Sequence, residues 1–173
     1  PNSPTRNSSQ KVITLARDPW NQNDVWVRDK ETEPWKPGVC LAHSVVDGGD
    51  CPDAAVCWRF NIELAKGGRV EVVTRAADSN CSEFEAVKRR DGAMDGANTN
   101  DMTYLSYLNE PEMLECLRRR YAANKIYTNT GPILLAINPF QELPLYSEEV
   151  LRGYINADMT DAARLGPHVY QVA

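Results

Sequence analysis

The sequence predicts an α/β chain in two parts: a small antiparallel β-barrel, then helices and the first strand or strands of a larger, incomplete sheet. Apolar and polar residues alternate over residues 57–64, which is typical of a strand with one buried and one wet face. Two consecutive glycines follow at positions 67 and 68, where a tight hairpin turn is expected. Residues 132–137 are apolar without alternation, which is typical of a strand covered on both faces.

The predicted barrel occupies residues 23–78 and follows a polar, flexible N-terminal segment over residues 1–22. Val25-Trp26-Val27 predicts its first strand, and residues 39–46 predict the second. The third strand has an inward face of four apolar residues: Trp58, Phe60, Ile62 and Leu64. Because the return strand begins at Val70 and turns recur about every ten residues, a small antiparallel barrel is favoured.

A linker is predicted over residues 79–100, where the basic cluster 88–90 is expected to face solvent among acidic neighbours. The predicted N-terminal part of a second domain occupies residues 101–173. It opens with a short helix over residues 101–107, which would turn Met102 and Leu105 inward.

Asn109-Glu110-Pro111-Glu112 predicts the start of the first long helix. Asn caps unpaired backbone N–H groups, Pro suits the first turn, and Glu three residues after the cap completes a capping box. Met113, Leu117 and Tyr121 recur at helical spacing and predict its buried stripe. The arginines at 118–120 are expected to face solvent and complement the helix dipole. A second helix is expected after Ser147.

A strand covered on both faces needs neighbours, so the run 132–137 is expected to belong to a larger sheet than this chain completes. Residues 138–146 follow its carboxyl end, which is where open α/β sheets usually bind ligands. An asparagine amide can donate to and accept from a base edge, a proline ring can pack on its face, and a tyrosine can stack on it. The alternative for this segment taken alone is a proline-terminated turn.

Composition argues against several classes of protein. The net charge of −5 is unlike that of a general nucleic-acid binder. No apolar run approaches the roughly 20 residues that span a bilayer, and the first ten residues lack the apolar core of a secretory signal. We therefore expect a cytoplasmic protein with neither nucleic acid nor membrane insertion among its interactions. The five cysteines lack zinc-site spacing, so reduced structural thiols and no metal are predicted.

The sequence contains no self-sufficient catalytic motif. A glycine-rich phosphate loop that ends in Gly-Lys-Ser or Gly-Lys-Thr is absent, as is a His-Glu-x-x-His zinc motif. The two histidines, His43 and His168, are far apart in the sequence, and each is expected to be a packed or surface residue. We predict no catalytic residue in this chain.

An ordered series of short motifs resembles the opening of the myosin motor core: Asp101-Met102-Thr103-Tyr104-Leu105, Leu108-Asn109-Glu110-Pro111, Arg120-Tyr121, Ile126-Tyr127-Thr128, Gly131-Pro132-Ile133-Leu134, Ala136-Ile137-Asn138-Pro139-Phe140 and Leu143-Pro144-Leu145-Tyr146. Residues 167–173 are similar to the stretch shortly before the myosin phosphate loop. Residues 25–74 resemble, in position and pattern, the Src-homology-3-like barrel that precedes many myosin motors. The resemblance implies a P-loop NTPase motor fragment with an incomplete motor core.

In that family the segment matching residues 138–146 is the purine-binding loop. The resemblance therefore assigns contacts with the adenine of ATP to Asn138, Pro139 and Tyr146. Gln141 and Glu142 stand where many relatives carry a basic residue, so no charged contact with nucleotide is expected from them. The phosphate loop and the switch segments, which hold the triphosphate and Mg²⁺, would lie beyond Ala173. The 173 residues alone are not expected to hydrolyse ATP.

For the whole protein, the resemblance implies an actin-based cytoskeletal motor that binds and hydrolyses ATP in the cytoplasm. The implied partners are ATP, the actin filament, mostly through other regions, and the remainder of the motor domain. One alternative is a non-enzymatic peptide-binding or interaction module, because some endocytic adaptors recognise the tripeptide Asn138-Pro139-Phe140. A position beside a buried strand would hide that tripeptide. Another alternative is a truncated, inactive motor.

Overall fold

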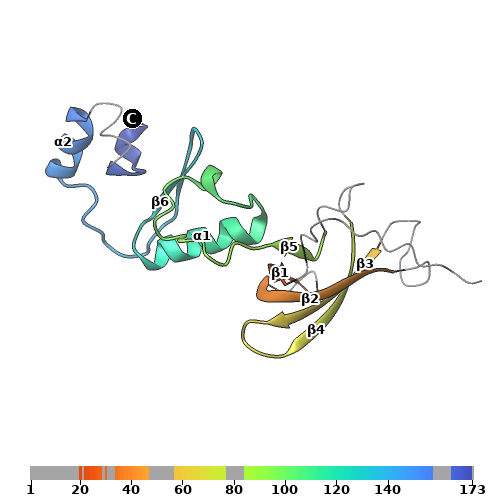
Figure 1. The fold of residues 1–173 in the computed structure, drawn as a ribbon. Helices are drawn as coiled ribbons and strands as arrows, with labels where there is room; N and C mark the ends of the chain where they lie inside the picture. Colours follow the sequence, from red (N-terminus) through yellow and green to blue (C-terminus); the bar gives the residue numbers. More distant parts are fainter. Residues whose placement is uncertain are drawn as a thin grey trace, which may run out of the picture.

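The computed structural model describes residues 20, 22–28, 30, 34–46, 57–76, 84–157 and 165–172. An antiparallel sheet at one end of an elongated molecule is followed by a long helix, a two-stranded hairpin and a second helix at the other end (Figure 1). No helix in the described ranges is long and apolar enough to cross a membrane.

The five-stranded sheet is formed by β1 (Asp24–Val27), β2 (Lys36–Val46), β3 (Cys57–Leu64), β4 (Arg69–Arg75) and β5 (Val87–Arg89). Its order is β4-β3-β2-β1-β5, and every neighbouring pair is antiparallel. An isolated bridge joins Ala76 to Phe84, and the Ala86 N–H donates to Thr74 Oγ1 at 3.0 Å. These contacts link the two outer strands, so the sheet is compatible with an Src-homology-3-like barrel. The predicted antiparallel sheet is confirmed.

The interior of the sheet has an aromatic centre. Phe60 and Ile62 of β3 are fully buried, whereas the intervening Asn61 is exposed, as the alternation predicts. The rings of Trp20, Phe60 and Phe84 pack edge to face, with centroids 4.8–5.6 Å apart. Such aromatic pairs contribute about 0.5–1.5 kcal/mol beyond the area they bury. The same cluster contains Val25, Val27, Cys40, Val72 and Val87.

The predicted turn between β3 and β4 is also present. Gly67 and Gly68 have φ angles of +89° and +93°, a backbone region that side chains other than glycine rarely adopt. The turn places Val72 on the buried face of β4 and the neighbouring Val73 on the exposed face.

Four features of the sheet differ from expectation. Trp20 lies within the predicted N-terminal lead-in but is buried in the core, and β5 comes from the predicted linker. The basic cluster is not simply solvated, because Arg89 lies over the rings of Trp20 and Tyr107, each 5.5 Å from the guanidinium carbon. Cys57 is buried and disulfide-bonded, which contradicts the expectation of reduced thiols. Residues 1–19 and 21 of the predicted N-terminal segment, and residues 47–53 between β2 and β3, lie outside the described residues.

The first helical elements begin where the sequence places them. A 3-10 turn, η1 (Met102–Tyr104), buries Met102 and is followed by the buried Leu105, whereas Tyr104 is 85% exposed. Helix α1 (Glu110–Ala122) begins after the predicted cap, where Asn109 Oδ1 accepts a hydrogen bond from the Glu112 N–H at 3.1 Å.

The buried face of α1 is largely polar, which the apolar periodicity did not predict. Glu112, Cys116 and Arg120 are buried at i, i+4 and i+8, while Tyr121 of the expected stripe is exposed. The Arg120 guanidinium is only 2% exposed and donates to Thr128 Oγ1 and to carbonyl or amide oxygens of Ala97, Thr99, Asn100 and Tyr127. A buried cation is tolerated when its donors are satisfied in this way. The expectation that Arg120 faces solvent is wrong.

A buried hydrogen-bond network joins the sheet to α1. Trp26 Nε1 of β1 donates to Glu112 Oε2 at 2.5 Å, and the Asp91 N–H donates to Glu112 Oε1 at 3.4 Å. Asn109 Nδ2 donates to the Arg89 carbonyl at 2.9 Å. Burial raises the pKa of the Glu112 carboxyl, although both of its hydrogen bonds act in the opposite direction.

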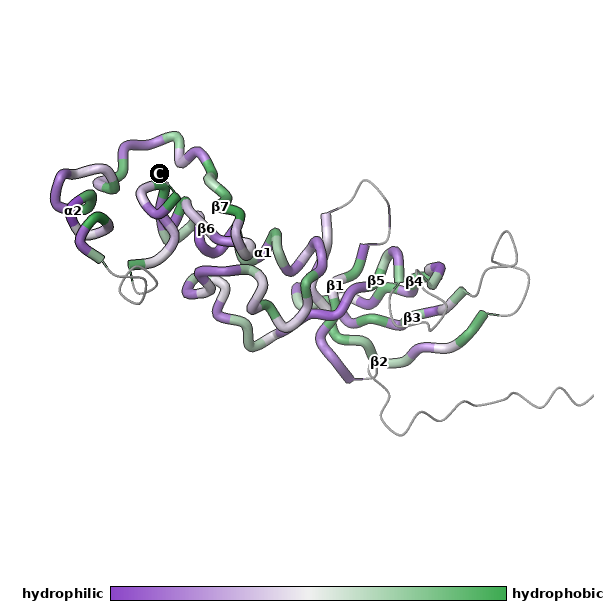
Figure 2. Tube along the Cα trace, turned by 90° about the horizontal axis from the view of Figure 1, so that it is seen from above, coloured by the Kyte–Doolittle hydropathy of each residue, from purple (hydrophilic) through white to green (hydrophobic). Residues whose placement is uncertain are grey.

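After α1 the chain forms an antiparallel hairpin of β6 (Tyr127–Thr130) and β7 (Ile133–Ala136). The apolar residues of β7 stand out in Figure 2, yet Ile133 and Ala136 are exposed and the two residues between them are half-buried. Within the described residues β7 pairs only with β6, so the expectation that it belongs to a larger sheet than this chain completes stays a prediction.

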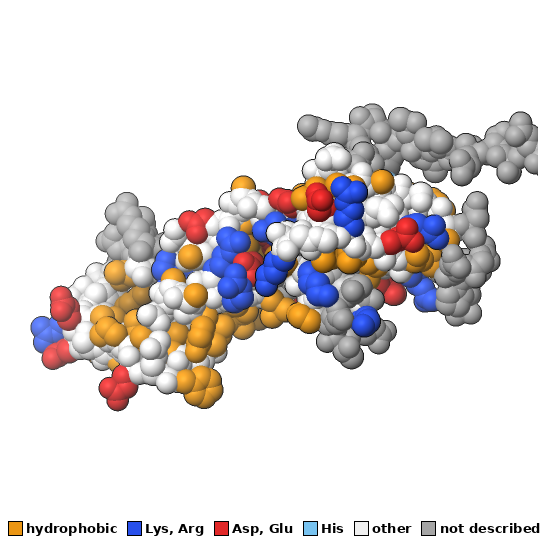
Figure 3. Space-filling view, turned by 90° about the horizontal axis from the view of Figure 1, so that it is seen from below, with side chains coloured by type: hydrophobic (Ala, Val, Ile, Leu, Met, Phe, Trp, Pro, Cys, Tyr) orange, Lys and Arg blue, Asp and Glu red, His pale blue; other side chains and the backbone are white. Residues whose placement is uncertain are grey.

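The last elements are α2 (Glu148–Asn156) and the 3-10 turn η2 (Val169–Gln171). Ser147 Oγ accepts a hydrogen bond from the Val150 N–H at 3.3 Å, which confirms the predicted start of α2. No residue of α2 is buried. Figure 3 shows hydrophobic side chains gathered on the half of the molecule that carries the hairpin and α2, and the exposed ones include Ile133, Phe140, Tyr146 and Ile155.

Candidate functional site

Residues 138–146 form a loop between β7 and α2 and line a pocket of about 470 Å³. The lining includes all three residues predicted to contact adenine: Asn138, Pro139 and Tyr146. Ile126, Gln141, Glu142 and Leu143 complete it. The fold thus brings Asn138, Pro139 and Tyr146 to one cavity together with Ile126, and their contact with a ligand remains a prediction.

The first turn of the loop is fixed by the Asn138 side chain. Its Oδ1 accepts a hydrogen bond from the Phe140 N–H at 2.9 Å, an arrangement that replaces a backbone turn. Phe140 has a φ of +51° and is 88% exposed. One lone pair of Oδ1 is used by the Phe140 N–H, which fixes the amide so that its NH₂ group is offered to a ligand.

The end of α1 and the turn that follows it hold the middle of the loop. The Tyr121 hydroxyl donates to the Pro139 carbonyl at 3.1 Å, and Gln141 Nε2 donates to Asn124 Oδ1 at 2.8 Å. Gln141, from which no charged contact with nucleotide is expected, is thereby engaged with Asn124. These two contacts place the pocket wall against a helix that is itself fixed by Arg120.

The far end of the loop is held by Tyr127 of β6. The hydroxyl groups of Tyr127 and Tyr146 lie 2.7 Å apart and share a hydrogen bond. Burial raises the pKa of the Tyr127 phenol to about 12, and the hydrogen bond with Tyr146 acts in the same direction. Tyr127 is therefore neutral at physiological pH, and Tyr146 remains 54% exposed at the pocket.

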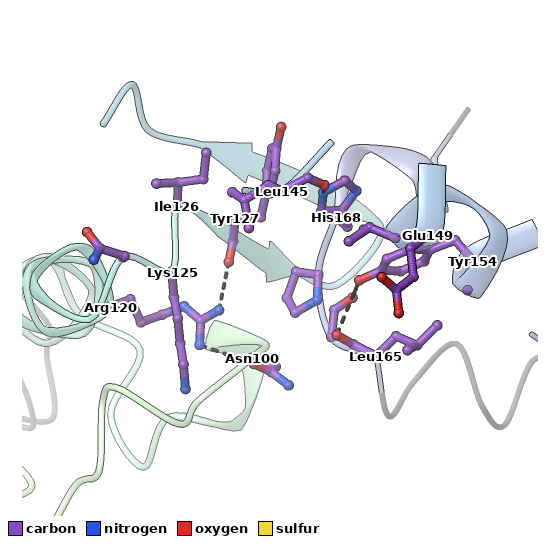
Figure 4. Close-up of a pocket in the computed structure, with 15 residues that line it drawn as sticks. Asn100, Arg120, Lys125, Ile126, Tyr127, Leu145, Glu149, Tyr154, Leu165 and His168 are labelled. Carbon is purple, nitrogen blue, oxygen red and sulfur yellow. Dashed lines mark hydrogen bonds between the residues drawn. The ribbon is translucent and has the colours of Figure 1, made fainter. Parts of the chain in front are cut away.

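A second pocket, of about 610 Å³, shares Ile126 with the first and is shown in Figure 4. Its walls bring together charged and aromatic groups of α1, α2 and the C-terminal segment, among them Arg120, Lys125, Glu149, Tyr154 and His168. Arg120 reaches Tyr127 and Asn100 here, and Lys125 Nζ donates to the Ala97 carbonyl at 3.0 Å. Arg120 and Lys125 thus each hold a neighbouring segment of chain in place.

Within the described part of the chain, no group of three or more His, Cys, Asp or Glu side chains could hold a metal ion. The pocket lining consists of two amides, one phenol, one proline, two aliphatic side chains and the carboxylate of Glu142, and its amides and rings suit hydrogen bonding and packing with a flat polar ring. The arrangement is that of a binding wall.

The model of the myosin head (motor domain) family matches residues 99–173. Residues 99–173 belong to the myosin motor-domain family. The chain is 36% identical over 149 residues to Myosin-16 of Arabidopsis thaliana, which covers 86% of this chain and 10% of that protein. Identity is 38% over 123 residues with Myosin-11 of the same plant (70% and 8%), and 48% over 84 residues with Protein OPAQUE1 of Zea mays (48% and 5%). The chain therefore spans 5–10% of the lengths of these relatives.

The sequence pattern does not indicate several residues that hold the loop 138–146 in place. Tyr121 was assigned to an inward helical stripe, but its hydroxyl holds Pro139. The sequence predicts Tyr127 only as part of a strand and His168 as a packed or surface residue. His168 is indeed packed, at 4% exposure, but it also contacts the loop through the Leu145 carbonyl. Nothing in the local spacing signals these roles, because the partners lie 18 to 23 positions away.

Proposed function

We propose that residues 99–173 form the first part of an ATP-driven, actin-based motor domain of the P-loop NTPase class. In this proposal, residues 138–146 are the wall that contacts the adenine of ATP. The observation that supports it most is the pocket lined jointly by Asn138, Pro139 and Tyr146. The match to the myosin head family and the similarity to proteins named myosin support the motor as a whole.

Each wall residue has a distinct task in this proposal. The NH₂ group of Asn138 donates to a ring nitrogen of the base, since its Oδ1 is engaged by Phe140. The Pro139 ring packs against the base, and its carbonyl is held from behind by Tyr121. The exposed part of the Tyr146 ring packs on the base edge, while its hydroxyl is held by Tyr127.

The remaining parts of the motor are supplied by other segments. The outer edge of β7 would pair with a strand of the rest of the motor, and its exposed face would be packed against that part. An apolar strand with one partner otherwise leaves backbone groups and side chains uncovered. Phosphate binding, Mg²⁺ coordination and water positioning belong to those segments, as does most of the contact with actin. The protein would then be a cytoplasmic component associated with the actin cytoskeleton.

The test uses the complete motor that contains this chain and compares ATP affinity between wild type and Tyr146→Ala. Loss of the ring is expected to weaken ATP binding about threefold to tenfold, the equivalent of about 0.5–1.5 kcal/mol. Tyr104→Ala is the matched control, since Tyr104 is exposed and lies outside the pocket lining. Unchanged ATP affinity in Tyr146→Ala would count against the assignment.

One observation favours the alternative of an interaction module. Phe140 is exposed at the tip of an asparagine-stabilised turn, so the tripeptide 138–140 is accessible in this chain, contrary to expectation. Phe140→Ala separates the two readings, because it removes the exposed ring but no residue that lines the pocket. An adaptor-binding tripeptide would lose its partner in this variant, whereas a motor would keep its ATP affinity.

A further inference from the structure

His168 lies at the centre of an aromatic cluster at the C-terminal end of the described chain (Figure 4). Its ring stacks on Tyr154, with centroids 5.0 Å apart and an interplanar angle of 23°. The centroid of Tyr170 lies 4.6 Å away, that of Tyr127 5.0 Å and that of Tyr146 5.8 Å. The imidazole is therefore held in one orientation by rings from β6, α2, η2 and the loop.

Both ring nitrogens of His168 have defined partners. Nδ1 accepts a hydrogen bond from the Tyr170 N–H at 3.1 Å, so this nitrogen carries no proton. The neutral ring then carries its proton on Nε2, which lies 3.0 Å from the Leu145 carbonyl and donates to it. Burial lowers the pKa of His168 and favours this neutral form, against the opposing effect of the Leu145 bond.

The Leu145 carbonyl belongs to the peptide bond that enters Tyr146, so the donor on His168 restrains the backbone of the loop directly before that residue. Two further contacts restrain Tyr146: its hydroxyl pairs with Tyr127 at 2.7 Å, and its carbonyl accepts from the Tyr170 hydroxyl at 3.4 Å. Tyr170 is the same residue whose backbone N–H is bound by His168. The segment 168–170 thus holds one end of the loop at two points.

We propose that His168 is a positioning residue: through its Nε2 donor to the Leu145 carbonyl it fixes the Tyr146 ring in the orientation that contacts adenine. This inference rests on the proposed function of the loop. It adds that a segment some 22 positions downstream of Tyr146 sets the affinity for the base and leaves the affinity for the phosphate chain unchanged.

Two substitutions separate the two bonds of His168. Glutamine can place an amide donor near the position of Nε2 and keep the bond to Leu145. Asparagine can place an amide oxygen near Nδ1 and keep the bond from Tyr170, but it is too short to reach Leu145. In the complete motor, His168→Asn is expected to weaken ATP binding about threefold to tenfold, the loss of one net hydrogen bond, while His168→Gln stays within about twofold of wild type.

Inorganic tripolyphosphate is the matched ligand, because it keeps the phosphate chain and lacks the base. All variants are expected to bind it within about twofold of wild type. If His168→Asn weakens ATP and tripolyphosphate equally, His168 serves only folding and the inference is overturned. If His168→Gln loses as much ATP affinity as His168→Asn, the Nε2 donor is not the cause, and the inference is likewise overturned.

Tyr146→Ala in the same assay distinguishes this inference from the function on which it rests. Weaker ATP binding by Tyr146→Ala with normal binding by His168→Asn would overturn the role of His168 and leave the adenine loop standing. Normal ATP binding by Tyr146→Ala would overturn the adenine loop, and the positioning role with it.

Discussion

The sheet at one end of the molecule and the segment after residue 98 keep their shapes by different means. In the sheet, nine buried hydrophobic side chains form one described cluster, with the rings of Trp20, Phe60 and Phe84 at its centre. In the later segment the described cluster has three buried members: Met102, Leu105 and Cys116. Apolar burial, at about 25 cal/mol per Å², can stabilise the first region but contributes far less to the second.

Polar contacts take the place of a large apolar core in the later segment. Arg120 joins α1 to β6 and to the stretch around residue 99, and His168 joins η2 to the loop before Tyr146. Hydrogen bonds of this kind fix geometry but leave apolar side chains of β7 and α2 uncovered. The sheet thus has an apolar core of its own, whereas the later segment leaves apolar surface exposed, which under the proposed function other parts of the motor would cover.

The largest effect on stability is expected for a substitution in the apolar core of the sheet. Phe60→Ala should lower the free energy of unfolding of the sheet by about 3–5 kcal/mol, because it leaves a cavity in a fully buried cluster. All four tryptophans lie between residues 20 and 58, so tryptophan fluorescence during denaturant unfolding reports this region. Val73→Ala, on the exposed face of β4, should change the value by less than about 0.5 kcal/mol. Equal losses in the two variants would contradict the assigned core.

The next-largest effect is expected in the segment after residue 98, which is held together by polar contacts. Arg120→Met keeps much of the side-chain length but removes every donor, which leaves the buried carbonyls of Thr99 and Tyr127 unpaired. We expect the free energy of opening of the β6 amides, measured by hydrogen exchange, to fall by about 2–3 kcal/mol. Arg118→Met, two positions earlier on an exposed face, is the matched control and should cost less than about 0.5 kcal/mol. If Arg120→Met lowers the tryptophan transition as much as Phe60→Ala does, the two regions unfold as one unit.

The smallest effect concerns the junction between the two regions. Trp26→Phe and Glu112→Met, made singly and together, should show a coupling free energy of about 1 kcal/mol for the buried hydrogen bond, because neither replacement can form it. A coupling near zero would mean that the sheet and α1 are held together by other contacts.

The same carboxyl predicts a pH dependence. Because burial raises the pKa of Glu112 above its ordinary 4.5, the folded protein binds this proton more tightly than the unfolded chain. The contribution of Glu112 to the free energy of unfolding is therefore fully present below pH 4.5 and is lost as pH rises through the raised pKa of the folded state. Glu112→Gln should remove this component when denaturant unfolding is compared across that range. A pH profile unchanged by the substitution would contradict the burial of the carboxyl.

Features governed by neighbouring residues were predictable. Asn109 and Ser147 cap the helices that follow them, and the alternation in β3 places Phe60 and Ile62 inside. Features governed by distant residues were not. Glu112 fits a capping box by sequence, but its carboxylate binds Trp26, 86 positions away, and the predicted linker supplies β5 because Val87 fits the core of the sheet.

The sequence by itself determined the helix caps, the alternating faces of β3 and the resemblance to a myosin motor, and it predicts residues 138–146 as the segment that contacts a base. Tertiary structure alone decided which polar groups are buried, since a buried Arg120, Glu112 or His168 is stable only where donors and acceptors from remote segments converge on it. It also decided that β7 lies half-exposed, with Leu135 packed against Met102, Leu105 and Cys116. A strand is covered only by what packs against it, and the described chain supplies one neighbouring strand.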